Sequence, residues 1–286
     1  MSPTAIRRTG IPVAPLALLV PCLLIYLALL IWPQIMLLGS SFVDQGAIST
    51  VHYKKFFLDS YYWQLLGRTL LLGISVTAIT LVLGLPLAYV LARLDTRWAT
   101  VLLLMTTFPL LVSAVVRSFG WMVLFFRNGF VSQALMAVGI TDAPTQLMYT
   151  LPGVTIALAQ VLLPLMVLTL HGVFRSIDPD LEHAATSLGA SPAAAFWLVT
   201  LRLSRGGIVA GSLLVFALTI SAFATPSLVG GARANVMATA IYEQTIELLN
   251  WPFASALATI LLVFVIVLSL LYAFLLERGS ADKAQP

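Results

Sequence analysis

The polar side chains that could support chemistry or binding gather in one stretch, Ser176–Arg205, between long apolar runs. Asp178 is a good N-cap and Pro179 fits the first helical position, so a short helix is predicted to begin there. Apolar residues recur along it at helical spacing: Leu181, Ala184, Ala185 and Leu188. Gly189 ends this helix, because glycine tolerates the left-handed conformation, and Ser191-Pro192 begins a second one. Two capped helices joined by a glycine corner indicate either a docking element or a helix pair lying on a membrane surface.

No catalytic or metal-binding motif is found in the sequence. The chain has no phosphate-binding G-x-x-x-x-G-K-[ST], no H-E-x-x-H, no C-x-x-C and no G-x-S-x-G, so the corresponding sites lack their minimum parts. The three histidines, His52, His171 and His183, have no ligand partner at helical spacing, so no metal site is predicted. We therefore expect a chain that is not an enzyme and holds no cofactor of its own.

The composition is that of a membrane protein. Of the 286 residues, 60% are hydrophobic and 9% are charged, whereas soluble domains carry about 25% charged residues. The formal charge of +4 comes mostly from Arg and Lys that flank apolar runs, so no nucleic-acid partner is expected. The one cysteine, Cys22, lies in an apolar run and is predicted to be a packing residue.

Charge-free intervals of membrane-crossing length, about 20 residues each, predict six membrane helices in a single all-α domain spanning 1–286. Their approximate ranges are 13–38, 69–92, 98–126, 147–170, 206–229 and 253–276. The stretch Arg127–Gly139 is apolar but short, and is expected to lie at the surface or dip into the membrane. The polar segment 176–205 falls between the fourth and fifth helices.

Lysines and arginines in the loops set the expected orientation, because cytoplasmic loops carry an excess of them. With the N-terminus inside, nine of these residues lie inside and six outside. Arg7-Arg8 before the first helix and the tight turn Arg93–Arg97 strengthen the bias. We expect a multi-pass protein of a bacterial-type inner membrane, with both termini and the segment 176–205 in the cytoplasm.

The polar segment resembles the "EAA" signature of membrane subunits of binding-protein-dependent ABC importers. The similarity runs from Asp178 to Pro192, includes Phe196 and Val199–Leu201, and continues through Gly207–Phe216. Three further segments resemble the spermidine/putrescine-type permease branch: Arg127–Gly129, Pro226–Gly231 and Asn250–Phe253. The resemblance implies a fold like that of type I ABC importer permeases, with six helices and a cytoplasmic coupling helix between the fourth and fifth.

In that family the coupling helix fits a groove on a separate ATPase subunit. The coupling residues that the resemblance implies are Leu181, Glu182, His183, Ala184, Ala185, Leu188, Gly189 and Ala190. The implied partners are a dimer of ABC ATPase subunits that binds ATP and Mg, a second permease subunit, homologous or identical, and an extracytoplasmic solute-binding protein. The solute-binding protein is expected to dock on the loops 45–62 and 230–250.

Three positions depart from the signature. His183 stands where the signature has a glutamate before the alanine pair, although Glu182 is its neighbour, so which side chain makes the charged contact is open. Arg202 and Gly206 stand where the family usually has prolines, which leaves the geometry after the second short helix open.

Candidate substrate-pathway residues are polar or aromatic side chains within the predicted helices: Ser113, Arg117, Trp121, Gln160, Ser221 and Thr225. Each could equally make an interhelical hydrogen bond or, for Trp121, anchor the membrane interface. Arg117 either snorkels to the interface or faces the pathway, where it would attract a carboxylate or phosphonate. A small polar substrate is expected; polyamine, opine, amino-acid-like and phosphonate solutes all remain open.

The alternative is an ATP-independent secondary transporter or channel, which predicts midplane charges or an inverted repeat. The sequence shows neither. An intramembrane enzyme would need a nucleophile and a base, and the chain offers no such pair.

Overall fold

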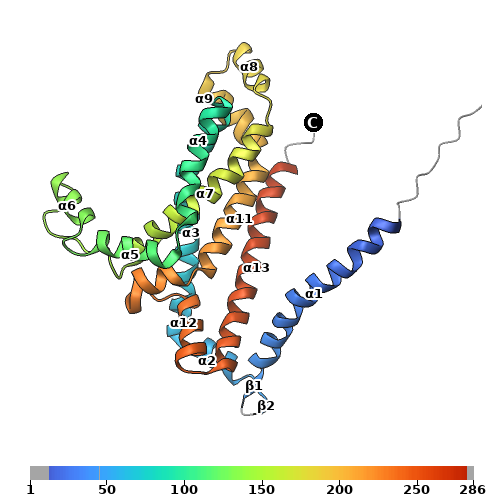
Figure 1. Cartoon of the computed structure of the whole chain (residues 1–286), viewed down its shortest axis with the longest axis vertical. Helices are drawn as coiled ribbons and strands as arrows, with labels where there is room; N and C mark the ends of the chain where they lie inside the picture. The colour runs from blue at the N-terminus through green and yellow to red at the C-terminus, as the bar shows by residue number, and fades with distance from the viewer. Residues whose placement is uncertain (1–12, 45, 282–286) are drawn as a thin grey trace, which may run out of the picture.

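The computed structural model describes residues 13–44 and 46–281, which are mostly helical (Figure 1). Strand structure in this part of the chain is limited to a small antiparallel hairpin, β1 (Val43–Asp44) and β2 (Ala47–Ile48). Four helices within it are long and apolar enough to cross a membrane: α1 (Val13–Ser41), α3 (Ser60–Arg93), α7 (Leu151–Ser176) and α13 (Trp251–Ala281). Two bent helix pairs raise the number to six if each pair is one crossing. The chain is an all-α polytopic membrane protein.

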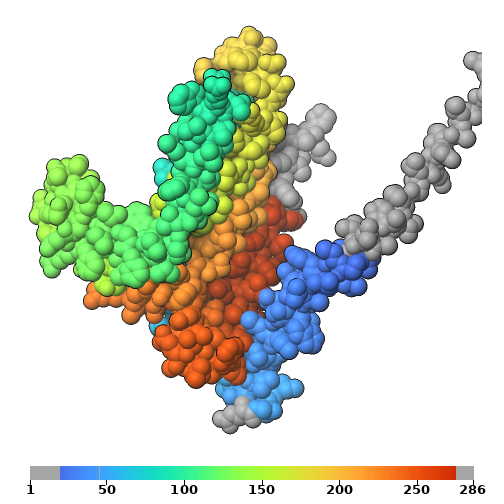
Figure 2. All heavy atoms as spheres, in the orientation of Figure 1, coloured from blue at the N-terminus to red at the C-terminus, as the bar shows by residue number. Residues whose placement is uncertain are grey.

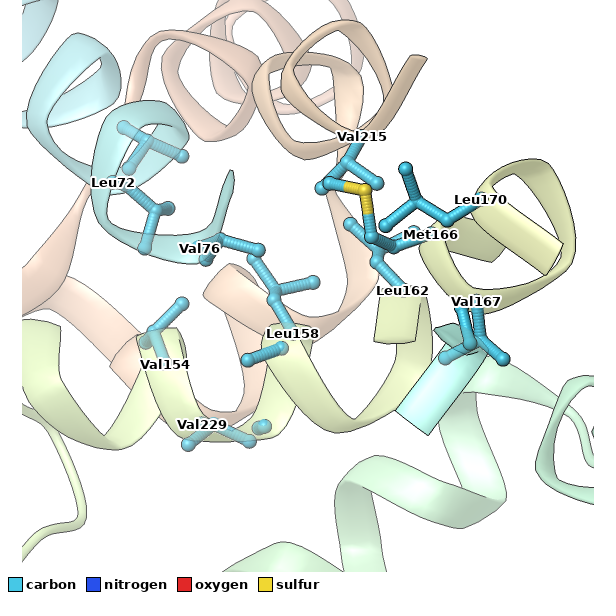
Figure 3. Close-up of a cluster of buried hydrophobic side chains, with 14 of the residues drawn as sticks. Leu72, Val76, Val154, Leu158, Leu162, Met166, Val167, Leu170, Val215 and Val229 are labelled. Carbon is cyan, nitrogen blue, oxygen red and sulfur yellow. The ribbon is translucent and has the colours of Figure 1, made fainter. Parts of the chain in front are cut away.

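The core lies where α3, α7 and α11 (Arg205–Ser221) pack together. Figure 3 shows buried side chains of these helices meeting, among them Val76 of α3, Met166 of α7 and Val215 of α11. Gly207 lets α11 approach α7 closely, because a Cβ at this position would lie 2.4 Å from Cγ2 of Val173. Membrane helices associate through such small-residue contacts, since lipid offers no hydrophobic driving force between them.

The predicted third span, 98–126, is not one continuous helix. It consists of α4 (Thr96–Thr107), a 3₁₀ turn η1 (Phe108–Leu111) and α5 (Ala114–Phe125), and the chain turns by 93° at the break. Pro109 has no amide hydrogen to continue the helix, and Ser113 has the extended backbone of a helix start (ψ 137°). The helix α6 (Phe130–Ala137) follows and projects beyond the end of α5, away from the bundle (Figure 1).

The predicted fifth span, 206–229, is also interrupted. The helix α11 ends at Ser221, because Ala222 takes an extended backbone, and a π-helical turn η3 (Pro226–Gly230) follows. Before α11, the chain runs through α9 (Pro192–Ala195), η2 (Phe196–Thr200) and α10 (Leu201–Leu203), and then bends by 67° into α11. The sequence left open the geometry after the second short helix, where Arg202 and Gly206 stand in place of prolines. In the structure this segment is helical and bends at Ser204, between α10 and α11.

The other predicted spans differ from the observed helices mainly at their ends. The helix α3 begins at Ser60, nine positions before the predicted start at 69, because Oδ1 of Asp59 caps it by accepting from the amide of Tyr61 at 2.9 Å. The helix α7 begins at Leu151 and runs to Ser176, beyond the predicted end at 170. Thr150 caps its start by accepting from the amide of Gly153 at 3.2 Å.

The first long helix, α1, diverges from the bundle (Figures 1 and 2). The apolar window within Val20–Ser41 has none of its residues buried inside the chain. Near its C-terminal end, the hydroxyl of Ser40 donates to that of Ser255 on α13 at 2.8 Å. Cys22 is exposed on this helix, so within this chain it is not the packing residue that was predicted.

The two ends of the bundle carry different elements (Figure 1). One end carries α8 (Asp180–Ser187) together with α9. The opposite end carries the β-hairpin and three short helical elements: α2 (Val51–Leu58), α12 (Met237–Tyr242) and η5 (Glu243–Glu247). The short 3₁₀ turn η4 (Gly231–Ala234) connects η3 towards α12.

Candidate functional site

The helix α8 forms the tip of the molecule at one end of the bundle (Figures 1 and 2). The helix begins at Asp180, one residue later than predicted, so Pro179 and not Asp178 takes the N-cap position. Oδ1 of Asp178 still accepts from the amide of Asp180 at 3.0 Å, at the start of the helix. Gly189 has φ +94°, which is the left-handed conformation predicted for the helix end. Ser191 begins the next helix by accepting from the amide of Ala194 at 3.2 Å. The predicted pair of capped short helices is confirmed.

Glu182 fastens α8 to the bundle. Its Oε2 accepts from the hydroxyl of Tyr89 at 2.8 Å, and its Oε1 accepts from Nη2 of Arg93 at 2.7 Å. The hydroxyl of Thr200, on η2, also donates to Oε1. Arg93 in addition donates from Nη1 to the carbonyl of Ile177 at 3.3 Å. One carboxylate thus joins α8 to the end of α3 and to the second short helix.

The pKa of the Glu182 carboxyl lies below its ordinary value. Burial by itself raises that pKa, but the donors on Thr200, Arg93 and Tyr89 together outweigh the burial because they stabilise the ionised form. The carboxyl is therefore a charged, fully engaged group at neutral pH.

The remaining predicted coupling residues lie largely on the outside of α8 and its corner. Leu188 is 90% exposed and Leu181 is 46% exposed, so the apolar stripe does not pack against the described part of this chain. His183, Ala184 and Gly189 are also exposed, whereas Ala185 and Ala190 are half-buried. Of the two polar candidates, Glu182 faces the bundle and His183 faces outward. The role of this surface in ATPase coupling stays a prediction.

Arg117 lies at the bend between η1 and α5. Its Nη1 donates to the carbonyl of Pro109 at 2.7 Å and to that of Val112 at 3.4 Å, so the guanidinium caps carbonyls that the helix break leaves free. Ser113 is exposed at the start of α5, in the same bend. Arg117 therefore stabilises the bend in the third span, and Ser113 lies at the bend, where α5 begins.

Arg117→Ala is expected to lower the free energy of unfolding by about 1.5–3 kcal/mol, because it removes charge-assisted hydrogen bonds at the bend. The measurement is the melting temperature of the detergent-solubilised chain, taken together with uptake in the reconstituted transporter. Impaired uptake at an unchanged melting temperature would instead place Arg117 in the substrate pathway.

The other predicted pathway residues are only partly brought together. Thr225 is buried, and its hydroxyl lies 3.3 Å from that of Ser118 on α5. Trp121 stacks on Phe125 with ring centroids 4.7 Å apart, as a packing residue would. Ser221 instead lines a separate pocket formed with residues of α1 and α13.

Gln160 is half-buried on α7, and its Oε1 has no hydrogen-bond partner among the described residues. An unpaired polar atom in a membrane helix is costly. Nε of Arg117 is likewise buried without a partner, so Gln160 and Arg117 are the two pathway candidates that leave a buried polar atom unpaired among the described residues. The pathway role of all six residues stays a prediction.

The two loops predicted to receive a binding protein share one hydrophobic cluster, at the end opposite α8. Phe56 of α2, Met237 of α12 and Phe253 of α13 are all fully buried within it. The same two loops also expose large apolar side chains, since Leu58 is 86% exposed and Leu249 is 70% exposed. Gln45 lies outside the described residues.

Three residues that anchor α8 were not singled out from the sequence: Tyr89, Arg93 and Thr200. Tyr89 and Arg93 lie about 90 positions before their partner, with separations of 93 and 89 residues, and no local pattern links them to it. The only available signal was polarity, since both stand at the charged end of an apolar helix.

The chain is thus a bundle of apolar helices with a polar helix, α8, fastened to one end. The chain belongs to the family described as binding-protein-dependent transport system inner membrane components, whose profile matches residues 80–279. It is therefore the transmembrane subunit of a binding-protein-dependent importer.

Two groups of relatives are named for different solutes. The chain is 31% identical over 247 residues to the spermidine/putrescine permease protein PotB of Escherichia coli, covering 84% of this chain and 90% of PotB. It is 33% identical over 195 residues to the molybdenum permease protein ModB of Mycobacterium tuberculosis, covering 68% of this chain and 72% of ModB.

A solved structure shares the fold. A bacterial ABC transporter for import of the acidic polysaccharide alginate has a chain that matches with a TM-score of 0.74 at 18% identity, covering 93% of this chain and 95% of that one. The same transporter, in complex with a periplasmic protein bound to an alginate pentasaccharide, matches with a TM-score of 0.75.

Proposed function

We propose that this chain forms half of a translocation pathway for a small polar solute, driven by ATP hydrolysis on separate ABC ATPase subunits that contact α8. The observation that carries the proposal is the two-sided character of α8. Its inner side is fastened to the bundle by Glu182, while its outer side exposes Leu181, Leu188 and the small residues around Gly189. A helix too short to cross a membrane, with one side fixed and the other free, suits a contact that transmits motion.

The contacts of Glu182 give this motion a route into the membrane. ATP binding would draw the two ATPase subunits together and carry the coupling helices with them. Because Glu182 bonds to Tyr89 and Arg93 of α3 and to Thr200 of η2, a displacement of α8 would pull on both. Rigid-body movement of packed helices is a usual way to switch a cavity from one side to the other. ATP and Mg would be held by the ATPase partner.

A second permease subunit, identical or homologous, would complete the pathway. The exposure of α1 supports this partner, because its apolar window has no burial within the chain and must be covered by lipid or by another chain. The opposite end of the bundle, around Leu58 and Leu249, is the proposed docking surface for an extracytoplasmic binding protein.

The substrate class that the relatives favour is a polyamine-like solute, since PotB matches over more of the chain than ModB. The opine, amino-acid-like and phosphonate classes remain alternatives. Arg117 does not decide between these classes, because its Nη1 donates to backbone carbonyls while its buried Nε has no partner among the described residues. Ligand binding by the partner binding protein would identify the solute.

We expect both chain ends and α8 on the cytoplasmic side of the inner membrane, because of the lysine and arginine bias of the loops. In a Cys22→Ser background, the cysteine of a Ser187→Cys variant should be protected from a membrane-impermeant thiol reagent in intact cells. It should become reactive once the membrane is made permeable. Labelling in intact cells would reverse the proposed orientation.

Co-purification tests the proposed function. An ABC-type ATPase should follow the chain when it is solubilised in mild detergent, and mass spectrometry would identify it. Its reproducible absence, with the chain itself folded and monodisperse, would contradict the proposed ATPase contact.

A further inference from the structure

A pocket of about 200 Å³ lies where the segment α9–η2–α10 bends into α11, beside the C-terminal half of α13. Two arginines line it, Arg202 on α10 and Arg205 at the start of α11. The rest of the lining is apolar or aromatic: Trp197, Leu201, Ile208, Val209 and Tyr272. The pocket thus pairs two cationic groups with an apolar wall.

Neither arginine is paired within the described residues. No hydrogen bond or ion pair joins Arg202 or Arg205 to another described side chain, and none of the described residues that line the pocket is acidic. Arg205 is half-buried and Arg202 is exposed at the mouth. Two cationic side chains on one pocket, with no counter-charge among its described lining, form a site that favours an anion.

The surroundings are those of a membrane interface. The segment Pro192–Leu203 turns 67° away from α11 and is too short to cross a membrane. It nevertheless exposes large apolar side chains, since Trp197 is 62% exposed, Leu198 is 58% exposed and Leu203 is 54% exposed. A short segment with exposed Trp and Leu beside arginines is typical of a helix lying in the headgroup region.

We propose that this pocket binds the headgroup of an anionic phospholipid of the phosphatidylglycerol type. The planar guanidinium groups of Arg202 and Arg205 present paired donors to a phosphate, and the apolar wall lies where acyl chains would continue. Pockets for drug-sized solutes enclose about 300–1,000 Å³, so this smaller space suits a headgroup better than a whole transported solute. The assignment to the cytoplasmic leaflet rests on the proposed orientation, whereas the site itself does not.

The site lies beside the contacts that anchor α8, because Arg202 is two residues after Thr200 in the sequence. The bound lipid would hold the segment Pro192–Leu203 against the bilayer, next to the Thr200 hydroxyl that anchors Glu182.

The test is lipid binding by the full-length chain, purified in mild detergent and followed by native mass spectrometry. Dioleoyl-phosphatidylglycerol should bind about thirtyfold more weakly to Arg202→Gln/Arg205→Gln than to wild type, since each arginine near an anionic surface contributes about fivefold. Dioleoyl-phosphatidylcholine should bind weakly to both proteins. The double variant Arg202→Lys/Arg205→Lys should retain most of the binding, because it keeps both charges.

Arg97→Gln is the matched control, because Arg97 is an exposed arginine outside this pocket. It should leave phosphatidylglycerol binding unchanged. Equal binding by wild type and Arg202→Gln/Arg205→Gln, or an equal loss in Arg97→Gln, would overturn the proposal. So would equally tight binding of inorganic phosphate, which would make the site one for a soluble anion. Retained lipid binding with loss of the co-purifying ATPase would show that the arginines contact a protein instead.

Discussion

Ala185→Trp is expected to abolish ATPase association while leaving the permease inserted in the membrane. Ala185 is half-buried on α8, between the exposed Leu181 and Leu188, and a small residue there lets another surface approach closely. An indole ring at this position would hold a partner away by steric exclusion. The measurement is the amount of ATPase recovered per permease after mild solubilisation, and recovery at the wild-type level would contradict the prediction. Ala193→Trp, at an exposed alanine of α9 outside the predicted coupling set, is the control.

A substitution at Gly189 tests the same ATPase contact through the backbone conformation at the end of α8. Its φ of +94° is strained for any residue with a Cβ, by roughly 1–2 kcal/mol, so Gly189→Val should displace the corner and reduce coupling. No atom lies within 4 Å of a Cβ built at this position, so the effect does not come from a clash inside the chain. Gly189→Asn is the control, because asparagine tolerates the left-handed conformation, and it should keep much more activity.

Glu182→Ala is expected to uncouple transport from ATP hydrolysis, because it cuts the link between α8 and α3. It leaves Arg93, whose side chain is only 22% exposed, without its carboxylate, at a cost of about 1.5–3 kcal/mol. The readout that separates positioning from mere stability is the ratio of solute transported to ATP hydrolysed. Glu182→Gln keeps the shape and should give an intermediate ratio. A wild-type ratio in Glu182→Ala would show that the tether does not transmit the motion.

The hydrogen bonds that Glu182 accepts from Tyr89, Arg93 and Thr200 also predict a pH dependence of stability. Since the pKa of Glu182 is lower in the folded state than in the unfolded state, its stabilisation is present above the unfolded value and is lost as pH falls through the folded value. The difference in melting temperature between wild type and Glu182→Gln should therefore be largest at neutral pH and shrink in acid. A difference that stays constant down to acid pH would contradict the assigned charge state.

The local features of α8 could be predicted because they depend on neighbouring residues. Asp178, Gly189 and Ser191 act on backbone groups within a few positions, so their chemistry alone defined both short helices. Apolar runs between charges likewise located the membrane helices, since length and hydropathy decide whether a helix can cross. The family resemblance then supplied the class of protein, which the comparisons confirmed.

Three other features could not be predicted from hydropathy: the exact helix ends, the sharpness of the break in the third span, and the long-range contacts of Glu182. The helix α3 begins at Ser60 and α7 ends at Ser176, so both extend past the apolar runs into more polar sequence. Hydropathy finds only the apolar part of such a helix. The break at Ser113 lies inside an apolar run that contains a proline. A mild proline kink and a 93° turn would leave the same apolar sequence, so hydropathy could not tell them apart. The inward direction of Glu182 depends on Arg93, which is far away in the sequence, so the sequence left Glu182 and His183 as equal candidates for the partner contact.

Photo-crosslinking from α8 tests the central claim most directly. In a Cys22→Ser background, a benzophenone attached to the cysteine of a Leu188→Cys variant would stand at the most exposed apolar position of α8 and its corner. We predict a crosslink to an ABC-type ATPase, and no such crosslink from a Leu249→Cys variant at the opposite end of the bundle. Crosslinks from Leu188→Cys to lipid or permease alone, in a complex active for transport, would contradict the assignment of α8 as the ATPase contact.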